Sequence, residues 1–299
     1  MNRFYLACAG LLLFACGTSN TPNEQALLDS LDTATEEAPT LSDELVGGIL
    51  QQIPAPLEIS VLIKENGANY DKALLNDPEK VSNYNSNHKR ALNLGVYGTD
   101  LGYTNIYEQN QDAMSYLNSV KDLADGLSIG QFFDFSMIRE LATNSSNLDS
   151  LLLITTRNFN DINGYLQDQK RSNLSVLLLT GGWLEAVHIL GEVSEGSPDN
   201  RELMERIGEQ KIILENIMLL LENYAGSDPQ IAELAAKMKE LQSAFEKIQI
   251  TTIYAEPTSK VVDGVLVIED NSRTTIDITT EDVENIRNAT DSIRNYIIG

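Results

Sequence analysis

Glu185 and His188 come closest to a metal-binding pattern in this sequence. They form a Glu-x-x-His pair, the spacing that places two metal ligands on one face of a helix. A di-iron site of the ferritin-like kind needs two such pairs and two further glutamates, but the chain has only two histidines. The other one, His88, has asparagine rather than glutamate three residues before it. The sequence therefore predicts no metal site and no cofactor.

Residues 91–107 combine three glycines with three tyrosines inside a run of helical periodicity. Gly95, Gly98 and Gly102 are three and four residues apart, so we expect them to share one helical face. Each glycine in a helix interior costs about 1 kcal/mol relative to alanine, so the set needs a structural reason. A close crossing with a second helix is the simplest reason, because small residues let backbones approach each other.

A second glycine pair, Gly181-Gly182, precedes the only tryptophan of the chain, Trp183. If the two glycine stretches meet, aromatic side chains can surround the crossing and form a ligand site. The alternative is that these side chains only fill the core, as most helical stripes do. The candidate ligand-binding residues on the first interpretation are Tyr97, Asp100, Tyr103, Tyr107, Trp183, Glu185 and His188.

The sequence predicts no catalytic residue. It contains no Gly-x-Ser-x-Gly elbow, no Walker motif and no Gly-x-Gly-x-x-Gly loop after a strand. A hydrolase that uses two carboxylates stays open as an alternative, because 44 acidic residues offer too many pairs to choose among. We expect the protein not to be an enzyme.

The N-terminus carries the most specific signal. Arg3 is the only charged residue among residues 1–15, and the apolar run 4–15 is too short to span a bilayer, which is typical of a cleaved signal peptide. The run ends in Leu-Phe-Ala followed by Cys16, which resembles the lipobox of bacterial lipoproteins. This resemblance implies cleavage before Cys16 and lipidation of its thiol. Cys8 would be removed, so the mature chain would contain no disulfide.

Residues 16–40 are rich in Thr, Ser, Asn, Pro and acidic residues, which predicts a flexible tether. The residue after the cysteine is Gly17, not the aspartate associated with inner-membrane retention in lipoproteins. We therefore expect an outer-membrane lipoprotein that faces the periplasm, with surface exposure as the alternative. The formal charge of −23 argues against nucleic acid as a partner.

Apolar periodicity predicts one mostly α-helical domain over residues 41–299. The apolar residues of segment 172–193 lie nearly all round, so it should be the central helix. Near 261–278 the pattern changes to β-branched runs, which predict a small antiparallel hairpin that turns at 269–272, with a third strand through Asp263-Gly264 as an addition. The expected helices are 41–53, 56–64, 83–127, 131–142, 147–169, 172–193, 200–224, 229–248 and a last one, 280–298, capped by Thr280.

Residues 89–107, the Gly-Gly-Trp helix, the hairpin and the terminal helix resemble a group of helical bacterial lipoproteins without an established activity. That resemblance implies the helical architecture and transfers no catalytic residue. Together these features predict a lipid-anchored binding or scaffold module of the cell envelope, attached to the membrane by its N-terminal lipid and engaged with an envelope protein. A sensor of a small ligand or peptide at the glycine–tyrosine crossing is the alternative.

Overall fold

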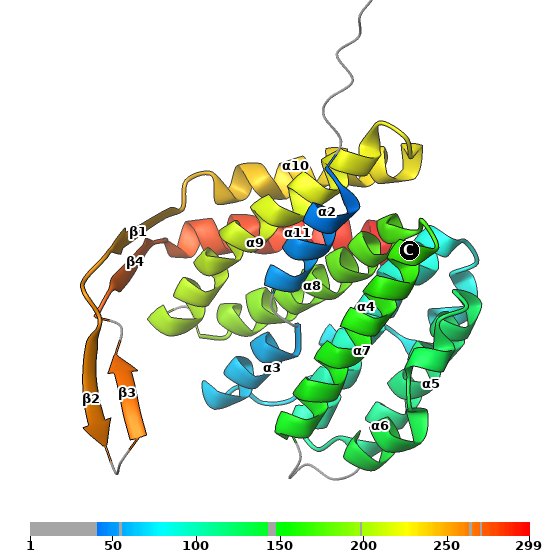
Figure 1. The fold of residues 1–299 in the computed structure, drawn as a ribbon, viewed down its shortest axis with the longest axis horizontal. Helices are drawn as coiled ribbons and strands as arrows, with labels where there is room; N and C mark the ends of the chain where they lie inside the picture. The colour runs from blue at the N-terminus through cyan, green and yellow to red at the C-terminus, as the bar shows by residue number, and fades with distance from the viewer. Residues whose placement is uncertain (1–40, 54–55, 143–147, 198, 263–264, 270) are drawn as a thin grey trace, which may run out of the picture. The chain divides into compact units, whose positions relative to one another are not determined.

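The computed structural model describes residues 41–299 except 54–55, 143–147, 198, 263–264 and 270 (Figure 1). The predicted signal peptide 1–15, the lipidated Cys16 and the tether 16–40 lie outside the described residues. Residues 41–299 form one compact unit.

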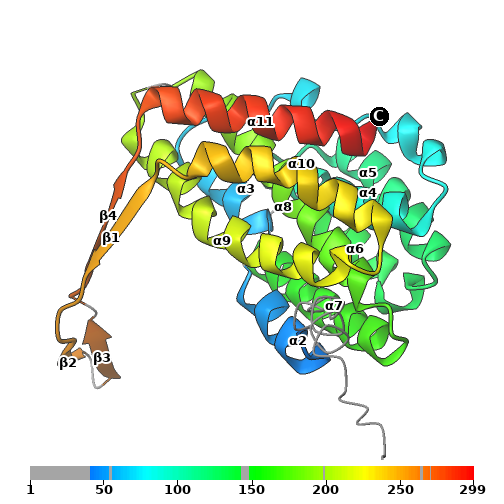
Figure 2. The same cartoon turned by 90° about the horizontal axis from the view of Figure 1, so that it is seen from above.

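The unit is a helical bundle with a small antiparallel β element before the last helix, which confirms the predicted fold class (Figures 1 and 2). Short 3-10 turns, η1 (Lys72–Leu74), η2 (Pro78–Asn83) and η3 (Gly130–Phe132), lie between the helices. The helices are α2 (Asp43–Gln52), α3 (Pro56–Glu65), α4 (Asn87–Ile106), α5 (Asn110–Gly126), α6 (Phe135–Ala142), α7 (Leu148–Asp168), α8 (Ser172–Glu195), α9 (Arg201–Ala225), α10 (Pro229–Phe245) and α11 (Thr280–Ile298).

Helix α8 is the centre of the bundle, as its sequence predicts. It packs against α4, α11, α9, α3 and α7. Within the described part of the chain it is the one helix long and apolar enough to cross a membrane, but 94% of its most apolar window is buried by the other helices. That burial accounts for its composition, because a helix covered on all sides has no face left for polar residues.

In three places a predicted helix is interrupted, divided or capped differently in the structure. The run 83–127 is not one helix: it breaks between α4 and α5 at Glu108, whose φ of 60° is left-handed. The predicted helix 131–142 divides into η3 and α6. The cap of α11 is Thr279, not Thr280: its hydroxyl accepts from the backbone N–H of Asp282, and the Asp282 carboxylate accepts from the backbone N–H of Thr279. Periodicity identified these segments correctly, whereas local capping geometry set their ends.

Helices α4 and α8 cross at very short distance through one glycine from each. A Cβ added to Gly95 would lie 2.0 Å from the backbone oxygen of Leu178, and one added to Gly181 would lie 2.0 Å from that of Leu92. The predicted crossing is therefore present. Gly98 is not part of it, because it is exposed and a Cβ there would meet nothing within 4 Å.

The β element is a two-stranded ribbon rather than a hairpin that turns at 269–272. Strand β1 (Gln249–Ile253) pairs with β4 (Arg273–Asp277), and β2 (Thr258–Val262) pairs with β3 (Val265–Glu269). The chain thus runs outward through β1 and β2 and returns through β3 and β4. Val262 pairs with Val265, and β3 and β4 do not pair with each other; the predicted Asp263-Gly264 turn itself lies outside the described residues.

The base of the ribbon is fixed to α9. Arg201 donates from its guanidinium to the backbone oxygens of Ile276 and Ile278, and both of these isoleucine side chains are buried. Gly208 leaves room for the Ile276 side chain, whose Cγ2 would lie 2.5 Å from an added Cβ. Strands β2 and β3 lie beyond β1 and β4, away from the helices (Figures 1 and 2).

Candidate functional site

The seven predicted ligand-binding residues lie on α4 and α8, but the structure does not gather them in one pocket. The tyrosines point toward the segment that precedes α4, and Trp183 makes its contact on α9. Only Asp100, Glu185 and His188 belong to a shared polar network. These three groups are described in turn.

The tyrosines of α4 hold the connecting segment 66–83 against the bundle. Tyr97 donates its hydroxyl to the backbone oxygen of Asp77 (2.7 Å), and Tyr107 donates to that of Ala68 (2.8 Å). The Tyr103 hydroxyl accepts from the backbone N–H of Asp71 (3.2 Å). Burial raises the pKa of Tyr97 and Tyr103, and it raises that of Tyr107 to about 12, so all three are neutral at physiological pH. They are core residues with satisfied hydroxyls.

Trp183 lies apart from the tyrosines. Its indole Nε1–H donates to Gln210 Oε1 on α9 at 3.0 Å, and both side chains are buried. A buried indole needs such an acceptor, because an unpaired N–H would be costly away from water. The predicted aromatic ring around the crossing of α4 and α8 is therefore not formed.

Glu185 forms a bidentate ion pair with Arg294 of α11. Arg294 Nε lies 2.6 Å from Glu185 Oε2 and Nη2 lies 2.6 Å from Oε1, and both side chains are buried. Arg294 Nη2 also donates to the backbone oxygen of Leu74 at 2.9 Å. This pair ties α8 to α11 and to the segment before α4, and it uses both oxygens of the carboxylate that the Glu-x-x-His pattern would assign to a metal.

Asp100 lies beside this ion pair and is completely buried. Burial, and next the neighbouring Glu185 carboxylate, raise the pKa of Asp100 well above its usual value. Its Oδ2 accepts from the backbone N–H of Asn76 at 3.2 Å. Both effects favour the neutral, protonated form of Asp100 beside the Glu185–Arg294 ion pair, which has one negative and one positive charge.

His188 continues the network toward the surface. Its Nε2 lies 3.1 Å from the backbone oxygen of Leu74, the same oxygen that Arg294 contacts, and its Nδ1 lies 2.6 Å from Asp291 Oδ1 on α11. One turn further along α8, Glu192 lies 3.1 Å from Arg287 of α11. Ionisable residues of α8 at 185, 188 and 192 thus face charged residues of α11 at 287, 291 and 294.

The sequence reasoning missed Arg294, Asp291 and Arg287. A signal for them was present, since the three are four and three residues apart and so share a face of the last helix. A glutamate inside the most apolar helix also demands a buried cation as partner. That demand does not identify which of the 21 Lys and Arg residues provides it.

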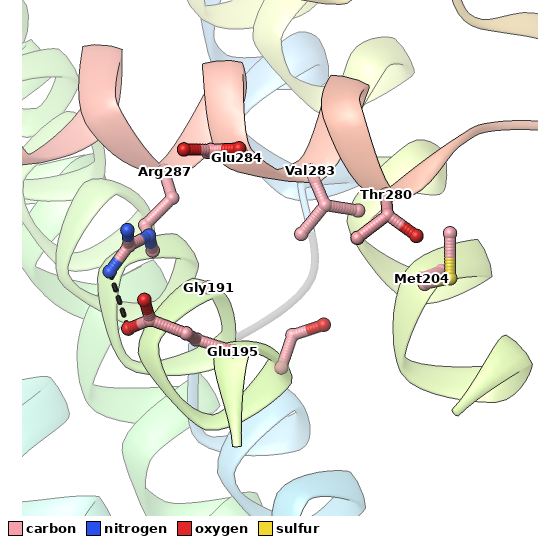
Figure 3. Close-up of a pocket in the computed structure, with 8 residues that line it drawn as sticks. Gly191, Glu195, Met204, Thr280, Val283, Glu284 and Arg287 are labelled. Atoms are coloured by element: carbon pink, nitrogen blue, oxygen red, sulfur yellow. Dashed lines mark hydrogen bonds and ion pairs between the residues drawn. The ribbon is translucent and has the colours of Figure 1, made fainter. Parts of the chain in front are cut away.

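A cavity of about 200 Å³ opens where α11 begins, beside α8 and the start of α9 (Figure 3). Arg287 lies at its edge and donates to Glu195 at 2.6 Å. Ser194, which is buried, contributes a hydroxyl without a hydrogen-bond partner. Its lining residues are Gly191, Ser194, Glu195, Met204, Thr280, Val283, Glu284 and Arg287.

Comparisons with protein-family models, with curated proteins and with solved structures give no significant match to this chain. The class that the fold and the site define is thus a structural one: a helical bundle that is pinned by a buried carboxyl–arginine network and that carries a β ribbon.

Proposed function

We propose that this chain is a lipid-anchored protein of the cell envelope and acts as a binding or scaffold module whose β ribbon contacts a partner protein. The anchor is Cys16, and the expected position is the periplasmic face of the outer membrane. No nucleic acid is involved, because the chain is strongly acidic.

Two exposed apolar residues where β1 ends carry this proposal. Ile253 is 66% exposed and Tyr254 is 86% exposed, the two highest values among the large apolar side chains of the described residues that face solvent. They are adjacent, at the outer end of β1. Neighbouring exposed apolar residues on a projecting element are typical of a protein-binding surface, and tyrosine is enriched among residues that dominate binding energy.

The structure supports the two alternative functions, a sensor and a hydrolase, less well. A sensor at the glycine–tyrosine crossing needs tyrosines that are free to meet a ligand, but Tyr97, Tyr103 and Tyr107 bond to the chain's own backbone. A carboxylate-dependent hydrolase needs an accessible pair of acids. The two acids of the buried network, Asp100 and Glu185, are sealed from solvent.

Site-specific photocrosslinking in cells tests the proposal. A photoreactive amino acid at position 254 should give a discrete crosslink to an envelope protein, and the same probe at Ile212, which is 51% exposed on α9, should not. A second variant joins Ile253 to Arg273 through an Asn-Gly turn and so removes β2 and β3. It should fold normally and lose co-purification of the crosslinked protein. Equal crosslinking from both positions, or co-purification that survives the deletion, would contradict the proposal.

A further inference from the structure

His188, Glu192 and Asp291 lie together where α8 passes α11. The first two are four residues apart and share a helix face, and Asp291 comes from the facing helix. One ligand atom from each residue lies within 4.8 Å of the other two. Imidazole nitrogen and carboxylate oxygen are ligands that zinc and related metals accept. The His188 side chain is 10% exposed and that of Asp291 is 32% exposed, so an ion can reach them from solvent.

The surroundings of the His188 ring favour a cation at Nδ1. The backbone oxygen of Leu74, 3.1 Å from Nε2, can only accept, so Nε2 carries a hydrogen. On the other side Nδ1 faces Asp291 Oδ1 at 2.6 Å, which is also an acceptor in its ionised form. A neutral imidazole has one N–H, so Nδ1 needs a second proton or a metal ion. A backbone carbonyl that holds the remote ring N–H is the usual support of a metal-bound histidine.

Glu192 can serve as a ligand without leaving a buried charge unpaired. Arg287 Nη1 lies 3.1 Å from Glu192 but 2.6 Å from Glu195, so the arginine keeps a carboxylate partner if Glu192 turns toward a metal. Glu185 has no such freedom, because both of its oxygens accept from Arg294. The ligand spacing on α8 is thus His-x-x-x-Glu and not the Glu-x-x-His pair seen in the sequence.

We propose that His188 Nδ1 and one carboxylate oxygen each from Glu192 and Asp291 bind a divalent transition-metal ion of the zinc class, with solvent in the remaining position. Metal–ligand bonds of 2.0–2.2 Å place neighbouring ligand atoms roughly 3.3 Å apart in a tetrahedral site. To reach that size, the carboxylate of Asp291 must turn so that its oxygen moves from 2.6 Å to about that distance from His188 Nδ1, and the other ligand distances, now within 4.8 Å, must shorten or hold. The sequence predicted no metal site because the Glu185–His188 pair lacks the second Glu-x-x-His pair of a di-iron site, whereas this set joins His188 to Asp291, 103 residues further along the chain.

Metal titration of the untagged full-length protein tests the proposal. After treatment with a chelator, the protein should bind one equivalent of Co²⁺, followed by its visible absorption, and Zn²⁺ should displace it. Asp291→Asn and Glu192→Gln should each weaken the affinity by about tenfold or more, at least the loss that removal of a supporting group causes at metal sites.

Two matched variants serve as controls. Glu209→Gln removes a carboxylate of α9 that pairs with Arg206 and lies outside both the ligand set and the contacts of Arg287. His88→Gln removes the other histidine, which pairs with Asp228. Both should bind one equivalent as the unchanged protein does, and circular dichroism should show that all four variants are folded. No one-equivalent binding, or equal affinity in the ligand and control variants, would overturn the proposal, since acidic surfaces also attract metals without a site.

Discussion

Two carboxyl side chains of one buried network, Glu185 and Asp100, have opposite roles because their partners differ. Glu185 accepts two N–H groups from Arg294, so its negative charge is compensated. Asp100 meets the backbone N–H of Asn76 and the Glu185 carboxylate, and burial raises its pKa and so favours its protonated form. A buried ion pair is costly to break but adds little net stability relative to apolar packing, so its main effect is to fix how α8 and α11 meet.

Glu185→Gln should destabilise the protein strongly. The substitution leaves the Arg294 guanidinium buried without a counter-charge. Such a change lowers the free energy of unfolding by about 3–5 kcal/mol. Urea unfolding followed by circular dichroism measures the change. Glu192→Gln is the matched control, because Glu192 is partly exposed and Arg287 keeps Glu195. A midpoint for Glu185→Gln equal to that of the control would show that the pair does not support the fold.

Asp100→Asn should remove the decrease in stability that ionisation of Asp100 causes at higher pH. The folded pKa of Asp100 lies well above the ordinary value of 3.8. Stability from this group is therefore fully present below pH 3.8 and is lost as pH rises from there toward the folded pKa, because the unfolded chain ionises first. Asparagine has the same shape, stays neutral and retains an acceptor for Asn76. We expect the variant to match the unchanged protein in acid and to be the more stable at pH 8, as measured by denaturant unfolding across pH. A lower stability than the unchanged protein at pH 8 would contradict this assignment.

Residue types reveal which side chains demand partners but not which partners they obtain. Asp100, Glu185 and His188 were selected from the sequence, and the structure places them in one network. Arg294 and Asp291 were not selected, because more than 100 residues separate them from Glu185 and His188 and only tertiary packing brings them close. The tyrosines were selected for a ligand, but their acceptors are backbone oxygens of an irregular segment, which no periodicity predicts.

At the scale of elements, the glycine stretches correctly predicted that α4 and α8 cross closely. The prediction failed at Gly98 because a helix advances about 100° per residue. Gly98 is therefore turned by roughly 60° from Gly95 on the same helix, enough to leave the contact. A spacing of three or four residues predicts which residues share a helical face, but it does not predict which of them lie inside the contact with a second helix.

Gly95→Ala and Gly98→Ala should change stability in opposite directions. A methyl group at Gly95 would lie 2.0 Å from a backbone oxygen and must push α8 away, so a loss of about 1–3 kcal/mol or more follows. At Gly98 the methyl group meets nothing within 4 Å, and alanine should stabilise the helix by about 1 kcal/mol. Melting temperatures of the two variants provide the test. A stabilised Gly95→Ala variant would exclude the close crossing.

The β strands show a similar limit to what the sequence can predict. Composition located them, but Asp263-Gly264 and residues 269–272 both contain turn-forming residues, and composition cannot decide between them. The register is decided by pairs such as Ile250 with Ile276, which bring an apolar face onto the helices. The surface proposed to bind a partner therefore follows from tertiary structure, whereas the existence of the ribbon follows from the sequence.

At the scale of the whole molecule, α8 has the composition of a membrane span but belongs to the core. Membrane attachment of the chain should therefore depend on the N-terminal lipid. The acidic surface offers no electrostatic substitute, since membranes with anionic lipids repel it. Several acyl chains on one residue suffice for a stable anchor, whereas a single chain binds only marginally.

Cys16→Ser should release the protein from membranes or leave it as an unprocessed precursor, because serine cannot carry the thioether-linked lipid. Cys8→Ser is the matched control: it makes the same replacement inside the apolar run that precedes the predicted cleavage site, and it should leave attachment unchanged. Fractionation after an alkaline high-salt wash, together with incorporation of a labelled fatty acid, separates the outcomes. If the Cys16→Ser protein has a cleaved N-terminus and still fractionates with membranes, the anchor lies elsewhere in the chain and the lipoprotein assignment is wrong.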